Sequence, residues 1–167
     1  MKKIILFFFV YLFYFSNLYA NEGVFFLDVD YVLKNSNSGK IVVNKLQELN
    51  SQNNLKFKNS EEEIKSLENE ITKVKNIISK DELNKKINNL KKKVLIFRDN
   101  KQIKLKEYNE IKNKELENYF KKISPVVQEF MKVKSIKIII DRKNIFIADS
   151  NYDITEDLIK FLNKKIN

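Results

Sequence analysis

The sequence contains no cysteine and no histidine, and it has only two glycines and one proline among 167 residues. Without cysteine, the chain has no disulfide framework, no thiol nucleophile and no cysteine-type zinc site. Without histidine, it lacks the side chain whose unperturbed pKa lies nearest neutrality. Two glycines leave little room for a phosphate-binding loop. These absences remove many common enzyme chemistries, so the informative features are charge and periodicity.

The remaining candidates for acid–base chemistry are aspartates, since catalysis by paired carboxylates needs two of them converging in one pocket. Each candidate instead has a plain role at a strand end, a turn or a helix cap. The run Glu61-Glu62-Glu63 places neighbouring carboxylates on different faces of a helix, so it is not a metal site. We therefore expect no enzymatic activity and no cofactor. The aspartates considered are Asp28, Asp30, Asp141, Asp149, Asp153 and Asp157.

The first twenty residues have the three parts of a secretory signal peptide. Lys2 and Lys3 give a positive start, residues 4–15 form a continuous apolar run, and a more polar exit ends at Ala20. The apolar run is shorter than the roughly 20 residues needed to span a bilayer. We predict cleavage after Ala20 and export, which argues against a nucleic-acid partner. The alternative is an uncleaved membrane anchor.

Residues 39–134 are almost free of glycine and proline, and their apolar residues recur at alternating steps of three and four. This rhythm is typical of helices that meet along a narrow seam, as in a coiled coil. A break at residues 79–81 divides the stretch into two arms. Since one long helix cannot bury such a stripe on itself, we predict an antiparallel hairpin of two helices. The expected seams are Val42, Leu46, Leu49, Asn53, Phe57, Ser60, Ile64, Leu67, Ile71, Val74 and Ile78, and Leu83, Ile87, Leu90, Val94, Phe97, Lys101, Leu105, Tyr108, Ile111, Leu116, Phe120 and Ile123.

Both arms lose their apolar seam at one level. Pairing residues that are equidistant from Lys80 places Ser60 near Asn100 and Lys101. A polar layer there either lets the arms bend or only sets the register of the two helices, and the sequence leaves both readings open. Pro125 lies further along the second arm, and a kink or helix end is expected there because proline removes an amide and clashes with the preceding turn.

The segments at the two ends of the chain predict a small body of strands. Residues 24–29 read as a strand and residues 30–34 as one helical turn. Residues 136–141 and 145–148 read as two strands joined in a β-hairpin. The apolar surface of these strands is larger than one short C-terminal helix can cover, and exposed strand edges need partners. We therefore predict oligomerisation through the strands.

Three helix caps are predicted from side chains that can accept an early amide proton. Ser38 is expected to cap the first long helix and Asp81 the second. Asp153 or Thr155 is expected to cap the C-terminal helix. The predicted division of the chain is a signal peptide (1–20), the first strand and start of the body (21–38), the hairpin arm (39–124), and the end of the long helix with two strands and a C-terminal helix (125–167).

A cluster of basic residues lies just beyond the tip of the hairpin, with few acids nearby. One interpretation is a solvated lysine-rich face. The other is a positive surface that attracts acidic chains or anionic lipid headgroups. The cluster consists of Lys85, Lys86, Lys91, Lys92, Lys93 and Arg98.

The order of these parts, from signal peptide to C-terminal helix, resembles the Skp/OmpH family of periplasmic chaperones. The resemblance covers essentially the whole mature chain, although each motif alone is weak. One departure is that Lys134-Ser135 stands where the family often has a glycine before the next strand. The matching segments are Leu27-Asp28-Val29-Asp30-Tyr31-Val32-Leu33, Ser36, Gly39-Lys40, Ser124-Pro125-Val126, Ile138-Ile139-Ile140-Asp141, Ile145-Phe146-Ile147, Asp153-Ile154-Thr155, Leu158-Ile159 and Leu162-Asn163.

The resemblance implies an α+β fold in which a long coiled-coil hairpin, or tentacle, stands on a strand body that forms a homotrimer. It also implies an ATP-independent periplasmic holdase of a Gram-negative cell that keeps unfolded outer-membrane β-barrel proteins from aggregating. Anionic lipid or lipopolysaccharide is a further candidate partner, although the lipopolysaccharide site of some members has no residue-by-residue match here. The residues expected in the trimer body are Val24, Phe26, Ile138, Ile140, Ile145 and Ile147.

Two other functions remain open from the sequence. One is an exported coiled-coil scaffold or adaptor without chaperone activity. The other is a membrane-anchored spacer, if the signal segment stays attached.

Overall fold

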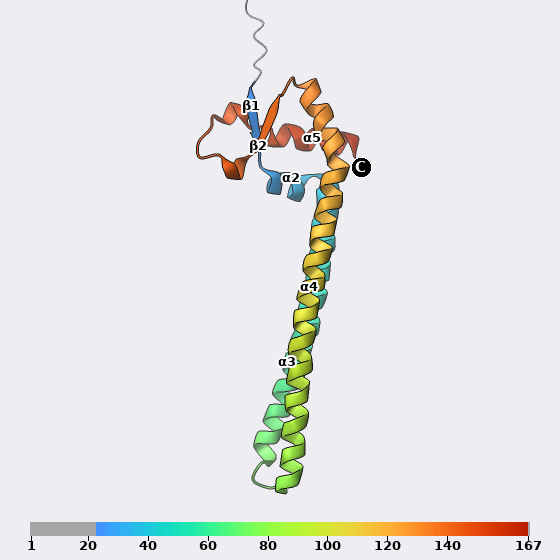
Figure 1. The fold of residues 1–167 in the computed structure, drawn as a ribbon, viewed down its shortest axis with the longest axis vertical. Coiled ribbons are helices and arrows are strands. Elements are labelled where there is room, and N and C mark those ends of the chain that lie inside the picture. Colours follow the sequence, from blue (N-terminus) through green and yellow to red (C-terminus); the bar gives the residue numbers. More distant parts are fainter. Residues whose placement is uncertain (1–22, 167) are drawn as a thin grey trace, which may run out of the picture. The chain divides into compact units, whose positions relative to one another are not determined.

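The structure, a computed structural model, describes residues 23–166 (Figure 1). The predicted signal peptide therefore lies outside the described residues. No helix in the described part is both long and apolar enough to cross a bilayer. The elements in order are β1 (Val24–Leu27), α2 (Val29–Asn35), α3 (Asn37–Val74), α4 (Lys80–Val133), β2 (Ile138–Asp141), the 3-10 turns η1 (Arg142–Asn144) and η2 (Ser150–Tyr152), and α5 (Thr155–Lys165).

The residues group into two compact units. The body unit takes in residues up to Lys40 and from Lys121 onward, and the arm unit is Ile41–Phe120. Both α3 and α4 contribute residues to each unit. The predicted combination of a long helical hairpin, a small amount of strand and a short C-terminal helix is confirmed within one chain.

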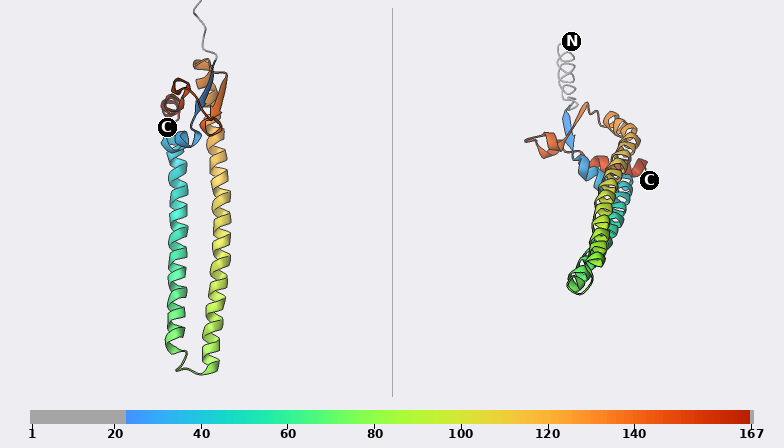
Figure 2. Two further views of the ribbon diagram at one scale, coloured as in Figure 1. Left: turned by 90° about the vertical axis from the view of Figure 1, so that its left-hand side faces the viewer. Right: turned by 60° about the horizontal axis from the view of Figure 1, so that its bottom comes forward.

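In the arm unit, α3 and α4 run antiparallel and are joined by a short loop (Figure 2). Contacts between the helices join residues at nearly equal distances from this loop, such as the ion pair between Lys45 and Glu115 at 2.7 Å. The predicted seam of the first arm is confirmed residue by residue, since each of its members is less exposed than the residues on either side. The 3-4 spacing thus determined which face of α3 meets α4.

The predicted seam of α4 is wrong at three positions. Leu105, Ile111 and Phe120 are exposed, whereas Lys104 and Tyr119 turn inward, with Tyr119 only 3% exposed. At Lys104 and Tyr119 the residue before the predicted one takes the place in the seam. A lysine can do this because its aliphatic stem covers apolar surface while its ammonium group stays in water.

The tip also differs from the prediction. α3 ends at Val74 rather than at residue 78, and residues 75–79 form the connection to α4. The Ser79 hydroxyl accepts a hydrogen bond from the amide of Glu82 at 3.3 Å. Ser79 therefore caps α4, and the prediction of Asp81 as the cap is wrong. Asp81 lies inside the first turn, where its charge favours the positive end of the helix dipole.

In the body unit, β1 and β2 form a two-stranded parallel sheet, with Val24 opposite Ile138 and Leu27 opposite Asp141. The amide of Ile154, just before α5, donates to the Phe26 carbonyl at 2.9 Å. The body core combines strand, helix and turn residues from both ends of the chain. Its buried apolar members are Phe26, Leu27, Val32, Ile123, Phe130, Ile136, Ile154, Leu158, Ile159 and Leu162.

The predicted β-hairpin over 136–148 is wrong. Strand β2 ends at Asp141, whose carboxylate accepts the amide of Lys143 at 3.2 Å and so begins a 3-10 turn. Residues 145–148 follow as irregular chain rather than as a second strand. Phe146 is fully exposed and Ile147 is 83% exposed. Among the described residues, this apolar segment pairs with neither strand of the sheet.

The start of α3 is built on close packing against α2. The Ser36 hydroxyl accepts the amide of Gly39 at 3.2 Å, so Ser36 is the cap and the prediction of Ser38 is wrong. The Asn163 side chain of α5 also accepts the amide of Asn37 at 2.7 Å. A Cβ on Gly39 would lie only 2.0 Å from the Leu33 carbonyl oxygen, so this turn requires glycine.

The predicted helix end at Pro125 is wrong, because α4 continues through it to Val133. The alternative, a kink at Pro125, stays a prediction. Two residues beyond the end of α4 lies Ser135, whose φ of 56° is the only positive value at a non-glycine residue in the described part. The amide of Ile136 donates to the Met131 carbonyl at 2.9 Å across this end. This is the left-handed ending that normally uses glycine, and Ser135 lies where the sequence departs from the expected family pattern.

Replacing Ser135 with glycine is expected to raise the free energy of unfolding by about 1 kcal/mol, because the left-handed conformation costs an L residue about that much. The measurement is thermal and urea unfolding of the chain from residue 21. Lys160→Gly, at an exposed position inside α5, is the control and should lower stability instead. A Ser135→Gly variant no more stable than the parent would contradict this account of the helix end.

Candidate functional site

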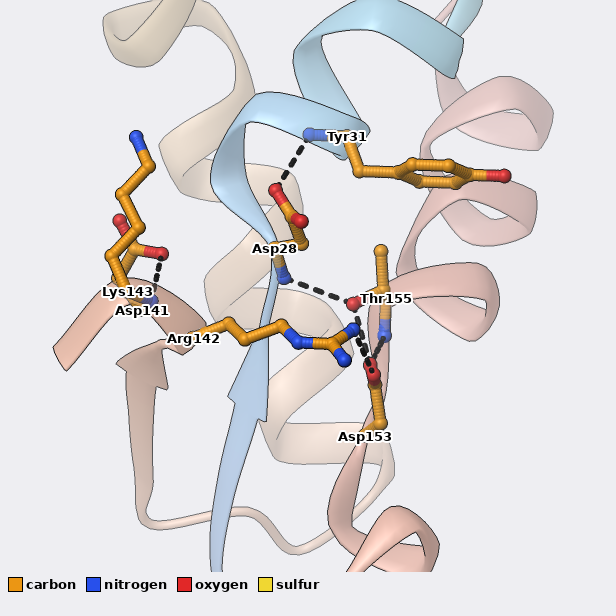
Figure 3. Close-up of polar contacts among 7 residues, drawn as sticks. All are labelled: Asp28, Tyr31, Asp141, Arg142, Lys143, Asp153 and Thr155. Carbon is orange, nitrogen blue, oxygen red and sulfur yellow. Dashed lines mark hydrogen bonds and ion pairs between the residues drawn. The ribbon is translucent and has the colours of Figure 1, made fainter. Parts of the chain in front are cut away.

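The aspartates considered for catalysis lie in the body unit, and three of them act as caps. Asp28 accepts the amide of Tyr31 at 2.8 Å at the start of α2, and its own amide donates to the Thr155 hydroxyl at 2.9 Å. That hydroxyl donates to Asp153 at 2.5 Å, and Asp153 also accepts the Thr155 amide at 2.9 Å (Figure 3). Thr155 is buried, so this network joins the start of α2 to the start of α5.

The remaining aspartates either form ion pairs or cap turns. Lys143 lies 2.8 Å from Asp30, and this ammonium holds the pKa of the Asp30 carboxyl below its usual range. Arg142 lies 3.5 Å from Asp153, as Figure 3 shows. Asp149 caps η2 through the amide of Asn151, and Asp157 pairs with Lys134 at 3.2 Å. Each of the six aspartates therefore has a structural partner.

The part of the chain that the structure describes has no group of three or more carboxylates that could hold a metal ion. Near α5, the carboxylate of Glu156 hydrogen-bonds the Tyr31 phenol and raises its pKa. This contact ties α2 to α5 and suggests no reaction. The candidate functional surfaces are therefore apolar and cationic surfaces rather than a catalytic pocket.

The first such surface is an apolar patch on the body unit. Val24 and Ile138 are paired across the sheet and are both about half exposed, and Ile147 is largely exposed. Phe26 is buried in the core of its own chain. A groove of about 340 Å³ lies beside the sheet, and its lining is Val24, Phe25, Phe26, Ile140, Ile145, Ala148, Asp149 and Tyr152. Of the six residues predicted for the trimer body, four line this groove.

The second surface is the basic cluster of α4 in the arm unit. Lys85, Lys91, Lys92 and Arg98 are exposed. Lys93 is partly covered and forms an ion pair with Glu63 across the seam. Among residues 23–166, Lys93 is the only member of the cluster that pairs with a carboxylate of α3, so most of the cluster is directed to solvent.

Two grooves accompany this basic surface. One has a volume of about 430 Å³ and contains Lys91 and Arg98 from the predicted cluster, together with Glu68, Leu90, Val94 and Leu95. The other has a volume of about 440 Å³, and its lining is Asn53, Lys56, Phe57, Ser60, Glu63, Ile64, Lys93, Ile96, Phe97, Asn100 and Lys104. We call these the aliphatic groove and the aromatic groove.

The aromatic groove lies at the polar layer predicted from the sequence. Ser60 and Asn100 line it together, as the pairing about Lys80 predicts. Phe57 and Phe97 meet edge to face, with ring centroids 6.4 Å apart. The Lys101 ammonium lies 5.5 and 5.4 Å from these two centroids and 3.3 Å from Glu61. Bending of the arm at this level stays a prediction, as does the alternative that the polar layer only sets the register of the two helices.

A family model described as outer membrane protein (OmpH-like) matches residues 23–162. The chain belongs to the OmpH-like family. A crystal structure of a proposed OmpH-like outer membrane chaperone from Caulobacter crescentus has the same fold, with a TM-score of 0.70 and 20% identity over 86% of this chain and 85% of that one. No curated protein matches the chain.

Sequence reasoning missed several residues on the surfaces of this OmpH-like chain. Tyr152 on the body was not singled out, nor were Leu95 and Ile96 on the arm, and Phe146 was named only as part of a predicted strand. Leu95 and Ile96 are adjacent apolar residues outside the seam of α4, and both are at least half exposed. The sequence did contain a signal for these two arm residues, since they are apolar but lie outside the 3-4 spacing of the seam. Packing between the two helices therefore does not explain them.

Proposed function

We propose that this OmpH-like protein is an ATP-independent holdase chaperone of the periplasm, which binds unfolded outer-membrane proteins between its helical arms. Family membership supports a chaperone role. The observation that carries the proposal is the arm surface, on which exposed aliphatic side chains lie among exposed cations along one helix. An unfolded barrel protein offers the complementary features, namely unpaired apolar strands with acidic residues.

The arm is suited to weak contacts over a large area. Two helices alone cannot close a core, and no side chain from residue 47 to residue 118 is fully buried. Exposed apolar side chains remain along the arm, at Leu55, Leu95, Ile96, Ile103 and Leu105. Many weak contacts on several arms add up through effective concentration, so holding and release need no nucleotide.

The proposed assembly is a homotrimer whose arms surround a cavity. The support is the apolar surface of the body, where Phe146 and Ile147 project from an irregular segment and strand β2 has one strand neighbour in the described part of the chain. A two-stranded sheet with an exposed apolar edge is marginal on its own. Pairing of residues 145–148 with another copy would give this segment the strand partner that its own chain does not supply.

Export to the periplasm rests on the sequence of residues 1–20, which has the form of a cleavable signal peptide. The surplus of cations on the arm also suits anionic lipid or lipopolysaccharide, and such contact would bring the loaded chaperone near the membrane.

A scaffold or adaptor without chaperone activity is the second candidate. The exposed apolar residues on the arm disfavour it, because a passive spacer gains nothing from leaving them in water. A membrane-anchored spacer would require that the signal segment is retained.

The chain from residue 21 is expected to suppress light scattering when a urea-unfolded outer-membrane barrel is diluted into buffer without ATP. A variant with glutamine at Lys85, Lys86, Lys91 and Lys92 should need roughly tenfold more protein at low salt, because each exposed charge pair contributes a few tenths of a kcal/mol. The difference should shrink as salt is added.

The matched control for this variant carries glutamine at Lys40, Lys112, Lys114 and Lys160, which are exposed lysines outside the cluster. It has the same net charge and should suppress scattering like the parent. No suppression by the parent chain would favour the scaffold reading. Equal losses in the two variants would mean that net charge matters and the cluster does not.

Light scattering after size exclusion is expected to give three times the mass of the chain. The double variant Phe146→Ser with Ile147→Asp should give a monomer, because it places a charge in the proposed interface. Ile77→Asp, which changes an equally exposed residue near the arm tip, should leave the mass unchanged. A monomeric parent, or a double variant that stays trimeric, would refute this interface.

A further inference from the structure

The aromatic groove differs from an ordinary gap in a helical seam. Its volume of about 440 Å³ is in the range of ligand pockets, whereas voids in close-packed protein are rarely larger than a water molecule. Apolar side chains from both helices line it, namely Phe57 and Ile64 of α3 and Ile96 and Phe97 of α4. The space therefore has an apolar lining that neither helix fills.

The two rings in its lining give this groove a preference for one kind of occupant. Phe57 and Phe97 stand almost perpendicular, at 83°, so the pair combines a ring face with a ring edge. Aromatic groups associate in such edge-to-face and offset arrangements, and an ammonium group favours the face of a ring. Lys101 lies within cation–π distance of both rings. An entering aromatic side chain would therefore find partners that an aliphatic one would not use.

The surroundings of the groove are positively charged. Residues 53–64 of α3 and 90–106 of α4 together carry nine lysines or arginines and four acidic residues. Lys93 and Lys104 have carboxylate partners in Glu63 and Glu107. Lys56, which also lines the groove, is exposed and has no ion-pair partner among residues 23–166. An acidic segment would complement this charge.

We propose that the aromatic groove is a binding subsite for an aromatic side chain of an unfolded polypeptide, with carboxylates on the neighbouring residues held by the lysines at the rim. This inference rests on the proposed chaperone function and specifies which client segments the arm prefers. Outer-membrane barrels carry girdles of aromatic residues at the ends of their strands, so such segments recur along every client of this class.

The aliphatic groove provides an internal comparison. It has a similar volume and two cations, Lys91 and Arg98, but its apolar lining is Leu90, Val94 and Leu95 without any ring. Leu95 lines this groove and Ile96 lines the aromatic one. The two residues are adjacent in α4, aliphatic and similarly exposed, at 59% and 50%. They form a matched pair for mutation.

The test uses the chain from residue 21 and a short unfolded peptide with a single tryptophan flanked by aspartates. The protein has no tryptophan, so the fluorescence of the peptide reports binding without background. Ile96→Ser is expected to weaken binding by about tenfold, the effect of losing one well-buried aliphatic contact. Leu95→Ser should change the dissociation constant less than twofold.

Peptide controls separate the two parts of the recognition. Replacing the tryptophan with leucine, or the aspartates with asparagines, should weaken binding to the parent chain. Lys56→Gln should weaken binding of the aspartate peptide but leave that of the asparagine peptide unchanged. Equal effects of Ile96→Ser and Leu95→Ser, or a leucine peptide that binds as well as the tryptophan peptide, would overturn the subsite.

A second measurement does not depend on how the serine variants fold. Because the chain has no cysteine, Ile96→Cys or Leu95→Cys gives one attachment point for a bimane dye, which tryptophan quenches at contact distance. Quenching by the peptide is expected at position 96 and not at position 95. Equal quenching at both positions, or none at position 96, would reject the subsite. If the parent chain still suppressed barrel aggregation, the chaperone function would stand. Loss of that suppression in the parent chain would instead reject the chaperone function itself.

Discussion

The structure of the arm depends on one constraint, which is that two helices can bury only the stripe along which they meet. In α3 this stripe follows the 3-4 spacing of the sequence without exception. It is partly covered along most of its length, and within the arm unit full burial is reached only at Val42, Leu46 and Tyr119, close in sequence to the two points where the chain passes into the body unit. Everything outside the stripe faces solvent, so the composition of the outer faces is free to serve binding.

The body is held together by a different set of interactions. Its sheet has two strands, and its core joins segments from both ends of the chain. Aspartates cap three of its short helices and turns, and Gly39 permits α3 to begin directly against α2. These caps and this close contact between helices define a small, specific fold. They leave Phe146 and Ile147 outside it, as expected if the sheet is completed by other copies.

Much of this fold could be predicted from the sequence because periodicity and order carried the information. The seam of α3, the turn of helix at Tyr31 and the apolar face of α5 all follow from spacing. In α4 two adjacent residues compete for one seam position, as with Lys104 and Leu105 or Tyr119 and Phe120. A rule that assigns the seam position to the more apolar or the later residue of such a pair is wrong in both cases. A straight α-helix drifts by about 20° per heptad against a 3.5-residue repeat, so the facing helix decides between such neighbours.

The other misses have equally local causes. Residues 145–148 have the composition of a strand, but the hydrogen bond from the Lys143 amide to the Asp141 carboxylate begins a 3-10 turn that directs the chain away from β2. Composition does not show that β1 and β2 are parallel. On the arm, the basic cluster was visible in the sequence, but the grooves were not, because they depend on which side chains of α3 face Lys91 or Ile96.

The central claim is that the arms hold the client and the body assembles the arms. The most direct test replaces residues 41–120, the arm unit, with a short glycine–serine linker and compares this chain with the parent in dilution of a urea-unfolded outer-membrane barrel. The account predicts that the shortened chain keeps the oligomeric state of the parent and no longer suppresses aggregation. Suppression equal to that of the parent would contradict it.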